Sequence, residues 1–284
     1  MKNISVIIIN YNTADLTIKA MQALSMAEPN LALDYIVIDN NSRHPLNRDR
    51  LVNSANVQLI LNKNNIGFAR AVNQGIEIAK GEYILLLNSD VMMRTGVLTK
   101  LLVIMERSAH IGIIGPKMQY PNGRTQVSCG KFPTFFREFM RLSKLGQILP
   151  GGTLNDDNFF NKKYYQKAVP VDWVSGGCML LRRATVSDVG LFDKNYFFGI
   201  EDVDYSYRAK QKGWQVIFNP SDSVIHYHGQ SVGGRRSIAR LKYERTGILY
   251  FLRKFKMQSN TAMKAIDTFY AAKIFILQIL RLAA

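Results

Sequence analysis

The chain has 284 residues, of which 47% are hydrophobic and 20% charged, which excludes a disordered protein and allows one large domain or a smaller domain with an appendage. Its 37 lysines and arginines outnumber its 21 aspartates and glutamates, so the net charge of +16 favours a polyanionic partner such as nucleic acid, a phospholipid surface or a phosphorylated substrate. Two cysteines are too few for a disulfide scaffold and lack metal-ligand spacing, so we expect a reducing compartment.

Short β-branched runs in the first 115 residues predict strands of a covered parallel sheet, because they are apolar on both faces. These runs are residues 4–10, 35–40, 57–61 and 83–87. Helical patterns lie between them, at 13–26 with Thr13 as the expected N-cap and at 67–80 with Gly81 suited to a left-handed C-terminal position. The alternation predicts an open, mostly parallel α/β sheet with right-handed crossovers.

Polar residues follow three of the predicted strands, where ligands bind in open α/β sheets. The three groups are Asn10, Tyr11 and Asn12; Asp39, Asn40 and Asn41; and Asn88, Ser89 and Asp90. Helix capping explains the third group equally well, but capping does not require polar residues at every strand end.

Residues 120–170 break this pattern, being rich in glycine, proline, asparagine and aromatics. Within them, residues 134–149 form a basic amphipathic helical pattern, with Phe135, Phe139, Leu142 and Leu149 on one stripe. A helix lying on a membrane surface and a helix packed over the sheet are both consistent with it.

Carboxylates and histidines cluster further along the chain. Glu201, Asp202 and Asp204 stand at a predicted helix start, where anions are favourable for any helix. A strand pair is expected near 214–227, and His226 and His228 would share one face of an extended strand, which suits either metal binding or a polar surface strand.

The C-terminal part carries much of the positive charge, with eight cations and one anion between Arg235 and Lys256. The apolar run 274–280 is too short to span a bilayer, so we expect a cytoplasmic protein that docks on an anionic membrane surface through this basic tail, or forms a homodimer with it. Nucleic acid is a poorer partner, because carboxylates at the strand ends would repel its phosphates.

Seven motifs in order carry a family resemblance. They are VIIINYN, VIDNNS, NNIGFARAVNQGI, YILLLNSD, WVSGGCMLLRR, LFDKNYFFGIEDVDYSYR and IHYHGQS. Together they resemble glycosyltransferase family 2, inverting enzymes of GT-A fold, and look most like its bacterial rhamnosyltransferase branch. The resemblance implies a transferase domain over 1–232, with a nucleotide-sugar half (1–115) and an acceptor half (116–232), followed by a basic helical extension (233–284).

The resemblance also implies a donor site. It places the base of a nucleotide-diphosphate sugar against Asp39, with Asn10, Tyr11 and Asn12 in the same pocket. The other residues that it assigns to the donor are Arg70, Asn73, Asn88 and Ser89. The favoured donor is dTDP-rhamnose, with UDP-linked hexoses, galactofuranose included, as the alternative.

A metal and a general base complete the implied site. The usual Asp-x-Asp motif reads Asn88-Ser89-Asp90 here, so Mg²⁺ or Mn²⁺ would rest on Asp90 and His226, which fits the family position better than His228. Asp202 would remove the proton of the attacking hydroxyl, with Glu201 beside it.

The implied acceptor is a glycan or a polyprenyl-diphosphate-linked sugar in the assembly of O-antigen or capsule at the inner face of the bacterial membrane. Trp173, Gly176 and Gly177 would shape its pocket, although Trp173 is equally consistent with the protein core. A non-catalytic scaffold of the same fold on the membrane surface is the remaining alternative, motivated by the missing first aspartate.

Overall fold

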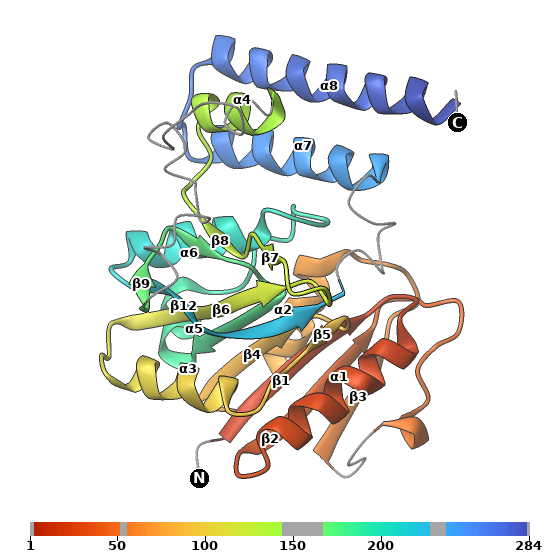
Figure 1. Cartoon of the computed structure of the whole chain (residues 1–284), viewed down its shortest axis with the longest axis vertical. Helices are drawn as coiled ribbons and strands as arrows, with labels where there is room; N and C mark the ends of the chain where they lie inside the picture. The colour runs from red at the N-terminus through yellow and green to blue at the C-terminus, as the bar shows by residue number, and fades with distance from the viewer. Residues whose placement is uncertain (1–2, 52–55, 144–166, 228–236, 283–284) are drawn as a thin grey trace.

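One mixed sheet with helices on both faces forms the centre of the molecule, and a separate layer of helices lies beyond one end of it (Figure 1). The structure is a computed structural model, and it describes residues 3–51, 56–143, 167–227 and 237–282. None of the helices in these ranges combines the length and apolar character needed to cross a bilayer.

The described strands that form this sheet number ten, in the order β3-β2-β1-β4-β11-β6-β12-β5, with β7 beside β6 and β9 beside β12. Their bounds are β1 Asn3–Asn10, β2 Ala32–Asp39, β3 Val57–Leu61, β4 Tyr83–Leu87, β5 Val91–Met92, β6 Ile111–Gln119, β7 Thr125–Gln126, β9 Val169–Pro170, β11 Cys178–Arg182 and β12 Gln215–His226. The first four strands pair in parallel, as do β6 and β12, whereas β11 is antiparallel to both of its neighbours. The predicted mostly parallel α/β sheet is confirmed.

The expected strand pair at 214–227 is wrong, because this segment is the single strand β12. Its register against β6 shifts between Asn219 and Ser223, so three residues bulge out. Pro220 lies in the bulge and lacks the N–H that a ladder hydrogen bond requires.

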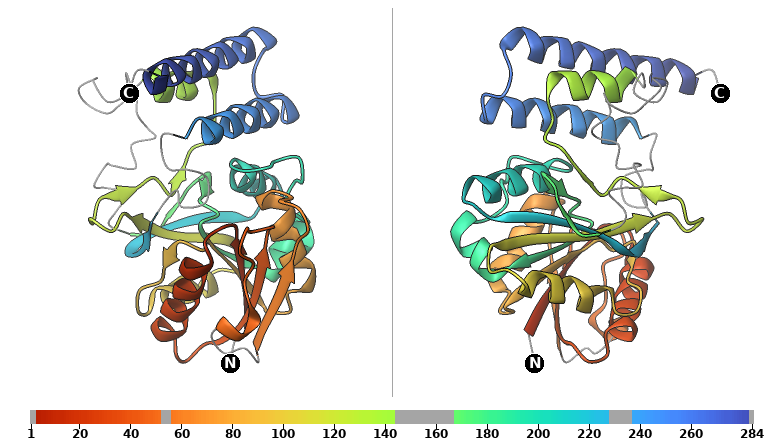
Figure 2. Two further views of the ribbon diagram at one scale, coloured as in Figure 1. Left: turned by 90° about the vertical axis from the view of Figure 1, so that its right-hand side faces the viewer. Right: turned by 60° about the vertical axis from the view of Figure 1, so that its left-hand side comes forward.

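Helices cover both faces of the sheet and divide the core in two (Figure 2). α1 (Ala14–Ala27) and α3 (Val97–Glu106) bury one face. α2 (Phe68–Ile78), α5 (Arg183–Val189) and α6 (Glu201–Gln211) bury the other. A short 3₁₀ helix, η1 (Arg48–Arg50), and a two-stranded sheet of β8 (Cys129–Gly130) and β10 (Trp173–Val174) complete this part.

Two expected helix signals have other roles. Thr13 is the N-cap of α1, but its hydroxyl bonds Asn10 Oδ1 (3.0 Å) and Ser89 Oγ (2.8 Å) instead of a helix amide. The backbone of Gly81 does not have the expected left-handed conformation. The position requires glycine because an added Cβ would lie 2.4 Å from the backbone nitrogen of Ser5.

A helical cap, formed by α4 (Phe135–Ser143), α7 (Ile238–Lys254) and α8 (Asn260–Leu282), lies over the carboxyl-terminal half of the domain (Figure 1). α4 is an amphipathic helix that packs, as one interpretation expected, but on α8 rather than over the sheet: the rings of Phe139 and Phe269 lie 5.2 Å apart. Residues 144–149 of the predicted helix lie outside the described residues. The expected transferase domain and extension therefore share this cap.

The cap is held by a charged network. The Arg141 guanidinium contacts Glu138 and Glu244, each at 2.6 Å, and also the Tyr270 hydroxyl, which joins all three helices. Arg141 itself is 41% exposed, but Glu138 and Tyr270 are buried, so removal of Arg141 would leave the Glu138 carboxylate buried without its cation.

Candidate active site

A cavity of 510 Å³ lies at the carboxyl ends of β1 and β4 and is bordered by the start of α6. We call it the sheet-end cavity. The expected site residues that line it are Tyr11, Asn88, Ser89, Asp90, Gly176, Gly177, Glu201, Asp202 and His226. The structure therefore brings together residues that are more than 200 positions apart in the sequence.

Asn10 and Asp39 do not line this cavity. They are register partners on β1 and β2, and Asn10 Nδ2 donates to Asp39 Oδ2 at 2.7 Å. The Asp39 carboxylate also accepts the backbone N–H groups of Ser42 (2.8 Å) and Leu46 (3.0 Å), and it is 1% exposed. These donors hold the carboxylate in the interior, where it fixes the loop after β2, and the expected contact between Asp39 and a base stays a prediction.

Three further expected donor residues also lie elsewhere. Asn12 is exposed in a turn with φ 58°, where its side chain accepts the N–H of Arg43. Arg70 and Asn73 of α2 donate to the backbone carbonyls of residues 194 (3.2 Å) and 192 (2.8 Å). They hold the segment that leads into α6 and do not enter the cavity, because α2 turns this face toward that segment.

Asp90 and His226 form the metal-competent pair of the cavity. Asp90 Oδ1 lies 3.2 Å from His226 Nε2, and both side chains are buried. Gln126 decides the tautomer: its Nε2 donates to the His226 carbonyl (2.6 Å), so its Oε1 is the acceptor for His226 Nδ1 (2.9 Å). In neutral His226, Nδ1 then carries the proton and the Nε2 lone pair faces the carboxylate.

The Nε2 lone pair of His226 and the carboxylate oxygen of Asp90 face each other, and both could coordinate one cation. A ligating histidine typically donates its other N–H to an oxygen, as His226 does to Gln126. The 3.2 Å separation is close to the ~3 Å between adjacent ligands on an octahedral ion with ligand distances of about 2.1 Å. The described residues hold no cluster of three or more histidine, cysteine or acidic ligands, so the other ligands of such an ion would be phosphate oxygens or water. His228 lies outside the described residues.

Glu201 and Asp202 begin α6 at the edge of the cavity. Asp202 accepts the N–H of Gly176 (2.8 Å) and of Val203 (2.9 Å), which orients its carboxylate. Burial raises the pKa of Asp202. Burial, with the nearby Asp202 charge, raises the pKa of Glu201 to about 8, so of the two carboxyl groups Asp202 ionises first and is the one able to accept a proton.

The backbone before α6 is held in an unusual conformation. Ile200 has φ 72°, which is rare for a β-branched residue. It packs against Gly247 of α7, where an added Cβ would lie 3.0 Å from the Ile200 side chain. On the other side, the Phe197 carbonyl accepts the N–H of Phe68 (2.7 Å), and Gly67 leaves room for that carbonyl. Two elements thus fix the position of Glu201 and Asp202.

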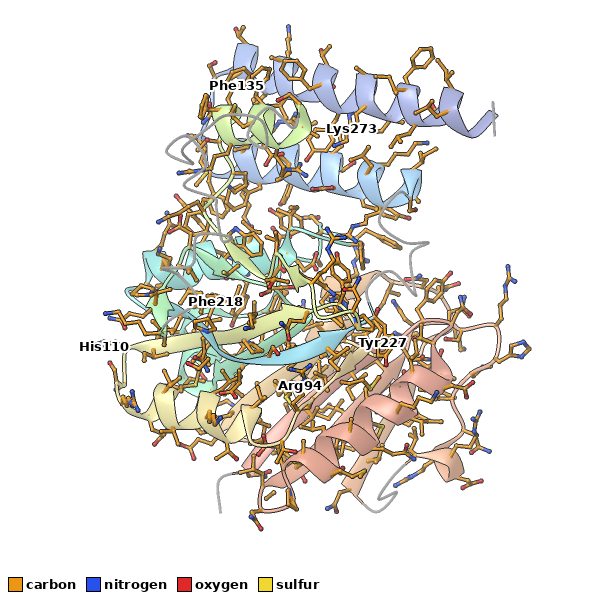
Figure 3. The ribbon with its side chains drawn as sticks, viewed as in Figure 1. Arg94, His110, Phe135, Phe218, Tyr227 and Lys273 are labelled. Atoms are coloured by element: carbon orange, nitrogen blue, oxygen red, sulfur yellow. The ribbon has the colours of Figure 1, made fainter. Side chains whose placement is uncertain are left out.

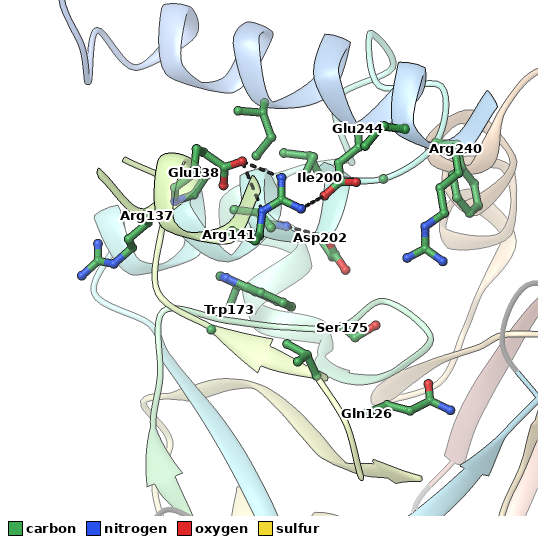
Figure 4. Close-up of a pocket in the computed structure, with 18 of the residues that line it drawn as sticks. Gln126, Arg137, Glu138, Arg141, Trp173, Ser175, Ile200, Asp202, Arg240 and Glu244 are labelled. Atoms are coloured by element: carbon green, nitrogen blue, oxygen red, sulfur yellow. Dashed lines mark hydrogen bonds and ion pairs between the residues drawn. The ribbon is translucent and has the colours of Figure 1, made fainter. Parts of the chain in front are cut away.

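A second cavity, of 810 Å³, lies between the helical cap and the domain below it (Figure 4). We call it the cap cavity. Trp173 lines it, and its Nε1 donates to the carbonyl of Lys131 (3.0 Å). Trp173 therefore lines the cavity and also packs against the hydrophobic core below it. Asp202 lines both cavities, and among the residues that the structure describes it is the carboxylate that they share.

A comparison with known protein families shows which family the chain belongs to. The model described as "Glycosyl transferase family 2" matches residues 5–190. The chain belongs to glycosyl transferase family 2. The match includes the strand ends of the glycosyltransferase up to Gly177, whereas Asp202, His226 and the C-terminal helices of the cap lie beyond its end.

Curated relatives place the transferase near the rhamnosyltransferase branch. It is 29% identical over 244 residues to N-acetylglucosaminyl-diphospho-decaprenol L-rhamnosyltransferase of Mycobacterium tuberculosis, covering 80% of this chain and 77% of the relative. It is 23% identical over 283 residues to the low-salt glycan biosynthesis hexosyltransferase Agl10 of Haloferax volcanii, covering 98% and 82%.

Solved structures confirm the GT-A fold of the transferase. A mannosyltransferase from Pyrobaculum calidifontis, solved with GDP-Man and Mn²⁺, has a TM-score of 0.58 at 15% identity and covers 99% of this chain and 75% of that one. TarS of S. aureus (residues 1–349) has a TM-score of 0.53 at 14% identity, covering 97% and 72%.

Sequence reasoning missed several residues of the glycosyltransferase site. Gln126 fixes His226, and Arg240 and Tyr243 of α7 line the sheet-end cavity. Gln126 stands in a segment without helical or strand periodicity, and Arg240 stands among many cations, so neither had a distinguishing signal. Asn40 was noted only as part of a polar strand end; its side chain bonds Asn65 (2.8 Å) and Asn62 (3.1 Å) at the cavity edge.

Proposed function

We propose that this glycosyltransferase is an inverting enzyme that moves L-rhamnose from dTDP-rhamnose onto a hydroxyl of a glycan or lipid-linked acceptor in the synthesis of a bacterial surface polysaccharide such as O-antigen or capsule. The observation that carries the proposal is the position of Asp202, on the border between two cavities. The sheet-end cavity would hold the donor, with its polar strand-end residues, and the cap cavity would hold the acceptor.

Asp202 would act as the general base. Hydrogen bonds from the N–H groups of Gly176 and Val203 orient its carboxylate. Because Asp202 ionises before Glu201, it can take the proton of the attacking hydroxyl. Because attack comes from the cap side and the leaving nucleotide lies on the sheet side, a single displacement inverts the anomeric centre. This geometry requires no covalent intermediate with the protein.

Asp90 and His226 would hold Mg²⁺ or Mn²⁺. Such an ion, when bound, neutralises the charge that develops on the departing diphosphate. The chain supplies only two ligands among its described residues, so donor phosphates would complete the site and metal affinity would depend on bound nucleotide. The Mn²⁺ in the structure of the Pyrobaculum mannosyltransferase supports a divalent ion in a site of this fold.

The test is turnover with purified protein. Nucleotide release is measured for dTDP-rhamnose, UDP-galactose, UDP-galactofuranose and GDP-mannose, with Mn²⁺ and an N-acetylglucosaminyl-diphospho-lipid as acceptor, and the product linkage is assigned by NMR. We expect dTDP-rhamnose to be preferred and its anomeric configuration to be inverted. A preference for a UDP-sugar would favour the hexosyltransferase alternative, for which the resemblance to Agl10 argues. Absence of transfer, with intact folding, would favour the scaffold.

The cap would also dock the enzyme on the inner face of the cell membrane. α8 exposes an apolar stripe of Phe269, Phe275, Ile276, Ile279 and Leu280, between 37% and 62% exposed. Among the tail cations, Arg245 and Lys254 pair with acidic side chains of the protein, so the exposed cations elsewhere in the tail are the ones available to lipid. Exposed cations that remain are Lys242, Arg253, Lys256 and Lys264. An apolar stripe flanked by cations is typical of helices that insert into a membrane surface. If the same stripe instead formed a homodimer, analytical ultracentrifugation would show a doubled mass.

A further inference from the structure

One lysine of the helical cap contacts both flanks of the turn that carries the proposed base. Lys254, the last residue of α7, places its Nζ 2.7 Å from Asp193 Oδ2 and 2.6 Å from Asp204 Oδ2. Asp193 stands in the segment that leads into α6, and Asp204 lies in the first turn of that helix. The ammonium group therefore closes a loop, residues 193–204, that contains Asp202.

The two carboxylates that bind Lys254 differ in their other partners. The side chain of Asp204 is fully buried, and it also contacts Arg208 Nε at 2.7 Å and accepts the Tyr196 hydroxyl at 3.1 Å. Without Lys254, Asp204 would still have a cation beside it, so no buried carboxylate would be left uncompensated. What would be lost is the link between Asp204 and Asp193, at the two ends of the loop.

Aromatic packing places the end of α7 over α6. Phe251 and Phe255 of α7 contact Tyr207 of α6, with ring centroids 5.6 and 4.2 Å apart, and Figure 3 shows side chains filling the space between the cap and the domain. The ammonium group of Lys254 lies 5.1 Å from the ring centroid of Phe255, and its side chain is 25% exposed. Its ion pairs are therefore partly desolvated, which makes them stronger than ion pairs on the protein surface.

The clamped loop also supplies a wall of the sheet-end cavity. Phe197, Phe198 and Gly199 line that cavity, whereas Lys254 lines neither cavity. On the side away from α7, side chains of α2 hold the segment before α6, as described above. A change at Lys254 removes no contact with a ligand in either cavity, so its effect on transfer would come through the position of the loop.

We propose that Lys254 is a positioning residue for sugar transfer: by holding Asp193 and Asp204 together, it fixes the turn before α6 and so the place of Asp202 at the border of the two cavities. The inference rests on the proposed function for the role of Asp202 as the base. The clamp itself, formed by Lys254, Asp193 and Asp204, is measurable without turnover. Because a misplacement of about 1 Å can lower a rate about 10²-fold, a small movement of this turn is sufficient.

Hydrogen exchange followed by mass spectrometry measures the clamp in the absence of substrate. Lys254→Met keeps most of the aliphatic side chain and removes its charge. We expect the amides of residues 196–204 to exchange about tenfold faster in this variant, and those of β1 and β4 to be unchanged. Unchanged exchange of residues 196–204 in Lys254→Met would overturn the proposal.

Arg245→Met is the matched control. Arg245 is also a cation of α7 paired with an aspartate, but its partner is Asp267 of α8, at 2.6 Å, which lies outside the loop. This variant should leave the exchange of residues 196–204 and kcat unchanged. An equal effect of Arg245→Met and Lys254→Met would overturn the proposal, because it would show that any lost ion pair of α7 loosens the loop.

Kinetics test whether the clamp acts through the base. Lys254→Met should lower kcat about 10–100-fold while the affinity for dTDP stays within about twofold by calorimetry. Lys254→Arg, whose guanidinium can donate to both carboxylates, should recover kcat to within about threefold of wild type. In an Asp202→Asn background, Lys254→Met should change kcat by less than about twofold, because the group that it positions is already absent. An equal loss in both backgrounds, or wild-type kcat in Lys254→Met, would overturn the proposal.

Asp193→Asn tests the clamp from its other end if Lys254→Met does not fold. The side chain of Asp193 is 14% exposed, and its replacement leaves Asp204 paired with Lys254 and Arg208. We expect faster exchange of residues 196–204 and a fall in kcat of about three- to tenfold; wild-type exchange in the folded variant would overturn the proposal. If the wild type transfers no sugar but exchange responds as expected, the proposed function fails and the control of this turn by Lys254 is supported.

Discussion

Replacement of Glu201 by glutamine tests the electrostatics at the start of α6. Glu201 is 5% exposed, its Oε2 is without a hydrogen-bond partner among the described residues, and its pKa is raised to about 8 by burial and by the charge of Asp202. Glutamine has nearly the shape of the protonated side chain and cannot ionise. The variant therefore keeps the native form of this group at every pH.

The sign of the effect follows from linkage. The pKa of Glu201 is higher in the folded protein than its usual 4.5, so its contribution to stability is fully present below pH 4.5 and is lost as pH rises toward about 8. At about 1.4 kcal/mol for each unit of pH above the usual pKa, the loss is about 1 kcal/mol at pH 5.5 and about 3 kcal/mol at pH 7. Glu201→Gln should recover these amounts.

Urea unfolding followed by tryptophan fluorescence measures this difference at pH 5.5, 7 and 8.5. We expect the variant to be more stable than wild type by a margin that grows with pH, and to retain activity at pH 7, where Glu201 is already neutral. A constant difference across the three pH values, or a less stable variant, would refute the assignment of Glu201 as the buried neutral partner.

Three other changes probe the remaining roles. Asp202→Asn should lower kcat by about 10²–10⁴ while dTDP affinity stays within about twofold by calorimetry, and wild-type turnover would exclude it as the base. Gln126→Leu leaves Asp90 and His226, the proposed metal ligands, in place. It should weaken Mn²⁺ binding in the presence of dTDP about 10–100-fold, as measured by electron paramagnetic resonance. Metal-independent turnover of the native protein would exclude the metal role. Phe275→Asp with Ile276→Asp should reduce flotation with anionic liposomes, whereas Leu61→Asp, a change at the exposed edge strand β3, should not; equal flotation of all three proteins would exclude the α8 stripe.

The sequence allowed prediction of the elements of the sheet because its buried strands are β-branched and apolar on both faces, as residues 4–10 and 83–87 are. The start of α6 was also predictable, since Glu201 and Asp202 follow a glycine-containing turn and precede a helical pattern. Both signals are local. A few neighbouring residues determine them, and the structure agrees with them to within a few positions.

The direction of side chains at the strand ends was not predictable in the same way. Asn10 and Asp39 were expected in the donor site because they end adjacent parallel strands, as Asn88 does. The structure adds their register: Asn10 and Asp39 lie opposite each other on β1 and β2, so their side chains hydrogen-bond in the interior, and their place in the donor site stays a prediction. Such pairing depends on contacts 29 residues apart, which no local pattern contains.

The cap borders the proposed catalytic site, although the family match ends at residue 190. A left-handed Ile200 costs about 1–3 kcal/mol and persists only where its surroundings impose it. Here α7 imposes it, by packing Gly247 against Ile200 and by pairing Lys254 with the buried Asp204 of α6 at 2.6 Å. The helix that contributes Arg240 to the cap cavity therefore also holds the turn before Asp202, so a change in how the cap sits on the domain would move the proposed base and the proposed acceptor cavity together.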